Sequence, residues 1–201
     1  MYKSLICLLV FCSLAGCATT PPKNQQNICS IFYEKEDWYE HALSAQKKWG
    51  TPIAVQMAII YQESRFQSDV RPPREWFLGV IPKFRSSSAY GYSQAQDATW
   101  EWYIKSTNNS GADRDDFDDA VDFVGWYTNV TQRKLGISKW DAEKQYLAYH
   151  EGHGGYSRGT FRTKPWLRKV AKRVGVNAKK YSAQLKGCET DLKSGWSLWP
   201  F

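Results

Sequence analysis

The chain has 201 residues, a formal net charge of +7 and an ordinary apolar fraction. This length allows one domain with a sizeable core, and the composition excludes a globally disordered chain. Ten Trp and twelve Tyr are present. Such rings fill cores or stack on sugar rings, and composition alone does not choose between these uses. The positive charge indicates an anionic partner.

The first 16 residues are predicted to be a signal peptide. Lys3 precedes a short apolar run, and Leu14-Ala15-Gly16-Cys17 looks like a bacterial lipobox. A lipobox implies cleavage before Cys17 and lipid attachment to it, while an ordinary secretory signal is the alternative. The apolar run is too short for a membrane span. Residues 17–28 then form a lipidated, flexible tether, which anchors a periplasm-facing protein in the cell envelope, with the outer membrane as the expected site.

Two cysteines remain in the expected folded domain, residues 29–201. Export to an oxidising compartment favours a disulfide between Cys29 and Cys188, and a nucleophilic cysteine is the alternative. A periplasmic location also argues against nucleic acid as the partner. It favours an anionic envelope polymer or a membrane surface.

Helical spacing of apolar residues predicts an all-α fold. The expected helices are 34–49, 53–64, 97–106, 116–135, 141–150, 164–174 and 177–186. Thr51 and Pro52 are the expected cap and first residue of the second helix. Residues 68–92 are rich in Pro, Gly and Ser and predict a long loop, with a short hairpin between 76 and 84. No stretch shows convincing strand alternation.

The second helix is apolar on several sides and ends in Gln62-Glu63-Ser64. A general acid that works near neutral pH needs a raised pKa, which burial in apolar surroundings provides. Glu63 is therefore a candidate catalytic acid. The alternative is a glutamate that is merely solvated at a helix end.

Two further segments accompany Glu63: Ala89–Gln96, which reads AYGYSQAQ, and Ala148–Gly154, which reads AYHEGHG. In this order and spacing, the three segments resemble the catalytic domain of soluble-type lytic transglycosylases and goose-type lysozymes. The resemblance covers roughly residues 38–175. Gly91-Tyr92-Ser93-Gln94 is similar to the family segment Gly-Leu-Met-Gln, and Ala148–Gly152 is similar to Ala-Tyr-Asn-x-Gly.

The resemblance implies a lysozyme-like fold that cleaves the β-1,4 bond between N-acetylmuramic acid and N-acetylglucosamine in peptidoglycan, with a 1,6-anhydro product. It implies Glu63 as the single general acid/base and requires no cofactor, no metal and no second carboxylate. The implied substrate-binding residues are Ser64, Tyr92, Gln94, Tyr149 and His150, with Tyr149 near the Glu63 carboxyl group. His150 departs from the family, which has Asn there.

Other interpretations stay open. A hydrolase could use the same acid, and a non-catalytic wall-binding lipoprotein could belong to an envelope or secretion machine. Glu151 is either a second carboxylate for hydrolysis or a solvated side chain. His150 and His153 lack the i, i+4 spacing that brings two histidines to one zinc ion. The aromatic tail from Trp196 to Phe201 either packs on the domain or binds a partner.

Overall fold

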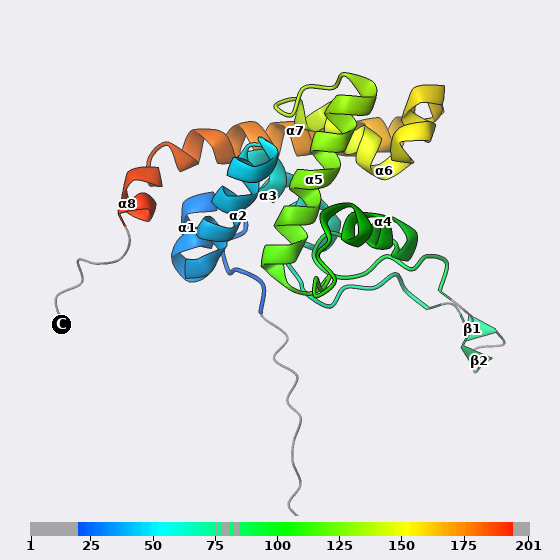
Figure 1. Cartoon of the computed structure of the whole chain (residues 1–201), viewed down its shortest axis with the longest axis horizontal. Coiled ribbons are helices and arrows are strands. Elements are labelled where there is room, and N and C mark those ends of the chain that lie inside the picture. Colours follow the sequence, from blue (N-terminus) through cyan, green and yellow to red (C-terminus); the bar gives the residue numbers. More distant parts are fainter. Residues whose placement is uncertain (1–19, 75, 78–80, 83–84, 195–201) are drawn as a thin grey trace, which may run out of the picture.

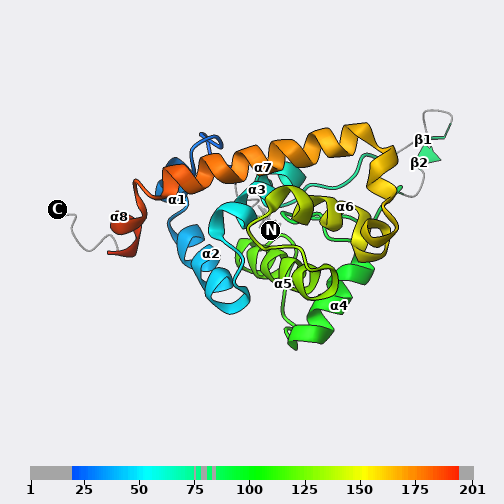
Figure 2. The ribbon, with the colours of Figure 1, turned by 90° about the horizontal axis from the view of Figure 1, so that it is seen from above.

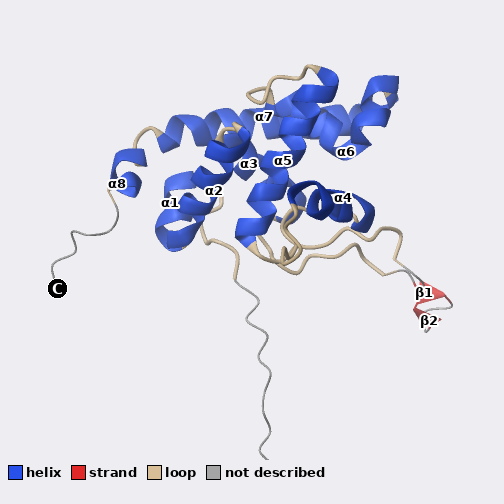
Figure 3. Ribbon diagram, viewed as in Figure 1, coloured by secondary structure: helices blue, strands red, loops and turns tan. Residues whose placement is uncertain are grey.

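The computed structural model describes residues 20–74, 76–77, 81–82 and 85–194. Helices make up most of this part of the chain (Figure 3), which confirms the all-α prediction. They are α1 Ile28–Glu34, α2 Glu36–Trp49, α3 Ile53–Ser64, α4 Asp97–Thr107, α5 Phe117–Leu135, α6 Ala142–Arg158, the 3₁₀ helix η1 Thr160–Thr163, α7 Pro165–Leu185 and α8 Glu189–Lys193. Within these residues, no helix is long and apolar enough to cross a membrane.

The only strands in the described part of the chain form a small hairpin. Strands β1 (Trp76–Phe77) and β2 (Ile81–Pro82) pair antiparallel, as predicted for the long loop. The hairpin projects from the helical body next to the loop that leads into α4 (Figure 1).

Helix α3 is the central element of the core. All of its residues except Gln62 and Glu63 are buried, because α2, α5, α6 and α7 pack around it. Its cap lies one residue later than predicted: Pro52 is the N-cap, and the Thr51 hydroxyl pairs with the Thr128 hydroxyl at 2.6 Å instead. The core therefore surrounds α3 on every side and leaves its carboxyl end as the part that reaches a surface.

Helix α7 runs along the whole length of the helical body (Figure 2). The sequence predicted two basic helices here with a break near Gly175, but one helix runs from Pro165 to Leu185. Gly175 lies where α7 passes α6, and a Cβ at this position would lie 3.3 Å from the Cβ of Glu143. The glycine permits close packing of two helices rather than ending one.

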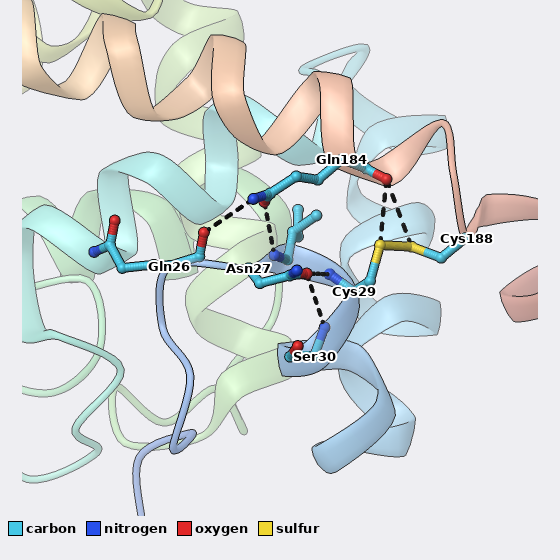
Figure 4. Close-up of a disulfide and its surroundings, with 7 residues drawn as sticks. Gln26, Asn27, Cys29, Ser30, Gln184 and Cys188 are labelled. Carbon is cyan, nitrogen blue, oxygen red and sulfur yellow. Dashed lines mark hydrogen bonds between the residues drawn. A yellow bond between two sulfur atoms is a disulfide. The ribbon is translucent and has the colours of Figure 1, made fainter.

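The two ends of the folded domain are joined by the predicted disulfide between Cys29 and Cys188 (Figure 4). Next to it, the side chain of Gln184 accepts a hydrogen bond from the Ile28 N–H at 3.1 Å and donates one to the Gln26 carbonyl at 3.1 Å. The Asn27 side chain caps α1 by accepting from the N–H groups of Cys29 and Ser30. The last residues of the predicted flexible tether are thus fixed against α7, and the ordered domain begins before Cys29.

Other predictions made for the chain ends lie outside the described residues. These are the signal peptide at 1–16, the lipid attachment at Cys17 and the aromatic tail from Trp196.

Candidate active site

A pocket of about 450 Å³ opens at the carboxyl end of α3. It lies between the loop before α4, the facing sides of α4 and α5, and the kinked part of α6. Its lining residues are Glu63, Ala89, Gln94, Ala95, Gln96, Thr99, Phe123, Tyr127, Tyr149, His150, Glu151 and Gly152.

Glu63 is held at the pocket by the end of α3. The next residues, Arg65 and Phe66, adopt left-handed conformations with φ of 55° and 60°, which turns the chain sharply. Phe66 is fully buried against Trp38, which fixes the turn that follows Glu63. Burial raises the pKa of Glu63 to about 7, although a hydrogen bond from Tyr146 lowers it. Both protonation states of Glu63 are therefore populated near neutral pH.

Two tyrosines of α6 contact this region in different ways. The Tyr146 hydroxyl donates to the Glu63 carboxylate, and burial together with the Glu63 charge raises the pKa of Tyr146, so it remains a donor. The Tyr149 hydroxyl donates to the Ser93 carbonyl at 2.6 Å. Burial, then the nearby Glu63 charge, raises the pKa of Tyr149. One tyrosine thus orients the acid, and the other fixes α6 to the opposite wall.

The opposite wall is formed by the segment Gly91–Gln94. At Gly91 φ is 74°, and a Cβ there would lie 2.0 Å from the Arg114 carbonyl oxygen, so only glycine fits. The Gln94 side-chain amide donates to the carbonyls of Val70 at 2.9 Å and Gly91 at 2.8 Å. Both amide hydrogens are used, which leaves the side-chain carbonyl oxygen as the group that can accept from a ligand.

A carboxylate with a different environment lies at the far side of the pocket. Gly152 interrupts the helical conformation of α6 with φ of 70° and ψ of 159°. Beside it, the Glu151 side chain is only 3% exposed and contacts Lys164 Nζ through both oxygens at 2.8 and 3.0 Å. Burial favours a raised pKa, but hydrogen bonds from Lys164, Thr160 and His150 lower the pKa of Glu151 to about 2. Glu151 is thus an ionised, fully engaged carboxylate, neither solvated nor free to act as a base.

The comparisons with known proteins agree with this geometry. The model of the family described as "Transglycosylase SLT domain" matches residues 5–188. The chain belongs to the transglycosylase SLT domain family. Searches of curated proteins and of solved structures gave no match. The resemblance drawn from the three motifs is confirmed, and with it a lysozyme-like domain of the lytic transglycosylase class, which acts on peptidoglycan in the cell envelope.

The structure brings together four of the six site residues that the sequence singled out in this SLT domain. Glu63, Gln94, Tyr149 and His150 all line the pocket. Ser64 and Tyr92 do not.

The placement of these two residues corrects the sequence interpretation. Ser64 is 2% exposed, and its hydroxyl donates to the Ile60 carbonyl of its own helix at 3.3 Å. Tyr92 is 1% exposed, and its ring packs edge-on against Trp38 and Phe117. It has the packing role of an apolar residue, and a buried ring cannot contact a glycan strand.

Tyr146 is the site residue that sequence reasoning missed. It lies three residues before Tyr149, so the two share a helix face, and this spacing was the available signal. The sequence spacing of Glu151 and Lys164 did not predict their ion pair, because the chain between them leaves α6 and turns before it enters α7.

Replacing Lys164 by Met is expected to lower the free energy of unfolding by about 2 kcal/mol, because it leaves the buried Glu151 carboxylate without its cation. Urea unfolding at pH 7 measures this change. Lys193→Met is the matched control: Lys193 pairs with Glu189 at the surface, and its loss should change the free energy by less than about 0.5 kcal/mol. Equal effects of the two substitutions would contradict the role of the Glu151–Lys164 pair.

Proposed function

We propose that this SLT protein is a lytic transglycosylase that cleaves the β-1,4 bond between N-acetylmuramic acid and N-acetylglucosamine, with Glu63 as its single acid/base. One observation carries the proposal. Among the described residues that line the pocket, only Glu63 and Glu151 are carboxylates, and only Glu63 has a pKa, about 7, suited to proton transfer at neutral pH.

In the proposed reaction, protonated Glu63 donates its proton to the glycosidic oxygen, and the bond to the anomeric carbon of the muramic acid breaks. Positive charge develops at that carbon, and the substrate N-acetyl group assists in stabilising it. The Glu63 carboxylate then takes the proton from the muramyl O6 hydroxyl. The O6 oxygen bonds to the anomeric carbon, which gives the 1,6-anhydro product without addition of water.

The surrounding residues support this sequence of steps. A carboxyl group with a pKa near the working pH can both give and take the proton. The hydrogen bond from Tyr146 stabilises the ionised carboxylate. The Gln94 carbonyl oxygen can accept from the N–H of a substrate acetamido group, and the largely buried rings of Phe123 and Tyr127 form the apolar base of the pocket.

The proposal includes export and lipid attachment at Cys17, with residues 1–16 removed. Disulfides persist in oxidising compartments, so the bond between Cys29 and Cys188 supports a periplasm-facing location.

The deciding experiment uses residues 18–201 and their Glu63→Gln variant with purified peptidoglycan. Mass spectrometry of the released fragments is expected to find anhydro-muropeptides, lighter by one water than hydrolysis products, with the native protein only. Fragments that carry the full water would instead support the hydrolase alternative. Sedimentation with the wall and no release would support the non-catalytic, wall-binding alternative.

Replacing Tyr146 by Phe is expected to raise the pKa of Glu63 above about 7, because the lost hydrogen bond stabilises the ionised form. The alkaline limb of the profile of kcat against pH should move to higher pH, and kcat should fall about tenfold because the carboxyl group is less well oriented. Tyr149→Phe is the control, since its hydroxyl bonds to Ser93 rather than to Glu63. An alkaline limb that does not move in Tyr146→Phe would contradict the assignment.

A further inference from the structure

Trp166 is an exposed aromatic side chain at the edge of the catalytic pocket. It lies in the first turn of α7 and is 56% exposed. Its ring meets the ring of His150 edge-on, with 5.3 Å between centroids, and His150 lines the pocket. An indole left in solvent beside a pocket needs an explanation, because burial of its apolar area would stabilise the fold.

The position of Trp166 is fixed from both sides. Lys164 is tied to the buried Glu151 carboxylate, and Pro165 occupies the first position of α7, where its restricted φ suits the helix. On the other side, Leu167 is fully buried. The backbone is therefore held while the indole stays in solvent, which is the arrangement of a preformed contact surface rather than of a frayed helix end.

Contacts between rings connect Trp166 with the acid. Tyr146 donates to Glu63. His150, one helical turn later, has its ring centroid 6.4 Å from that of Tyr146, and Trp166 follows at 5.3 Å from His150. Since Glu63 and His150 line the same pocket, a glycan strand with its scissile bond at Glu63 meets Trp166 where it passes His150.

The hydrogen bond between His150 Nδ1 and Glu151 determines whether His150 Nε2 donates or accepts. Its Nδ1 lies 3.1 Å from Glu151 Oε1. Because the pKa of Glu151 is about 2, this carboxylate is ionised and can only accept, so Nδ1 carries the hydrogen. In the neutral ring, Nε2 is then an acceptor.

We propose that Trp166 and His150 form an additional sugar-binding subsite beside the catalytic pocket. The indole face stacks on the C–H face of one pyranose ring of the glycan strand, beyond the pair of sugars joined by the cleaved bond. His150 Nε2 accepts a hydrogen bond from a hydroxyl of this ring. The exposed cations Arg168 and Lys169, which follow on α7, suit a strand that carries carboxylates. The subsite rests on the proposed function for the placement of the strand along Glu63, but its binding chemistry does not require cleavage.

The test measures binding without turnover. In the Glu63→Gln background, isothermal titration calorimetry and tryptophan fluorescence compare chitohexaose with chitotriose. Addition of Trp166→Ala is expected to weaken chitohexaose binding by about 3- to 10-fold, the size of one aromatic stacking contact, and to change chitotriose binding by less than about twofold. Trp140→Ala is the matched control: Trp140 is 75% exposed but belongs to a different pocket, and its loss should leave both affinities unchanged.

Unchanged chitohexaose affinity in Trp166→Ala overturns the subsite, and so does equal weakening by Trp140→Ala or no binding by the parent protein. Trp166→Phe keeps a ring and is expected to retain most of the affinity, which separates lost stacking from a disturbed fold. Failure of the native protein to release anhydro-muropeptides would overturn the proposed function. It would leave the subsite standing, since the binding measurement involves no cleavage.

Discussion

Replacing Glu63 by Gln is expected to abolish glycan cleavage and, above pH 7, to stabilise the fold. The amide keeps the shape of the side chain but cannot donate the proton. We expect the rate of anhydro-muropeptide release to fall by about 10³-fold or more, in line with the contribution of a positioned general acid. Release measured at equal protein concentration, beside the native protein, checks this part of the prediction.

The gain in stability follows from the raised pKa of the same group. Below pH 4.5 the Glu63 carboxyl is neutral in both the folded and the unfolded chain, so it does not affect stability. As the pH rises from 4.5 to about 7, the unfolded chain ionises first and is favoured. The native protein loses about 2 to 3 kcal/mol over this range through Glu63, and the Gln variant does not.

Urea unfolding at pH 4 and pH 8 measures both proteins. The variant should match the native protein at pH 4 and be more stable at pH 8. Glu151→Gln is a control for which the opposite change in stability is expected. Because the pKa of Glu151 is lowered in the folded chain, its ionised form stabilises the fold. Its replacement should therefore destabilise the protein at both pH values. A Glu63→Gln variant that is no more stable at pH 8 would show that Glu63 is not desolvated.

Replacing both Cys29 and Cys188 by Ser is expected to lower the free energy of unfolding by about 4 to 5 kcal/mol, because the disulfide closes a loop with a sequence separation of 159 residues. Urea unfolding of residues 18–201 measures the change. Reduction of the native protein should reproduce it, while reduction of the double variant should have no effect. Neither cysteine lines the pocket, so the molecules that remain folded should keep their activity. A loss below about 1 kcal/mol would mean that the unfolded chain was not constrained by this loop.

The apolar pattern was enough to predict the central helices, and Glu63 could be found because it is a carboxylate at the end of the most apolar of them. The continuity of α7 could not be predicted, because the role of Gly175 depends on Glu143 of another helix. The low helix propensity of glycine predicted a helix break at Gly175. In the structure, Gly175 instead lets α7 pack closely against α6.

The candidate site could be predicted in part for a similar reason. Motif positions identified Glu63, Gln94, Tyr149 and His150, but they did not separate pocket residues from core residues within a motif, so Ser64 and Tyr92 were misplaced. The ionised state of Glu151 depends on Lys164, which only the fold brings near.

Helix α7 also determines where an N-terminal attachment would lie relative to the glycan. The chain enters the domain beside Gln184, at one end of the helix, and the Glu151 side of the pocket is paired with Lys164, at the other. With 21 residues, the helix separates these points by roughly 30 Å. If the protein is held at a membrane through Cys17, this rigid spacing, added to the reach of the segment between Cys17 and Gln26, sets how far from the membrane the Glu151 side of the pocket can lie.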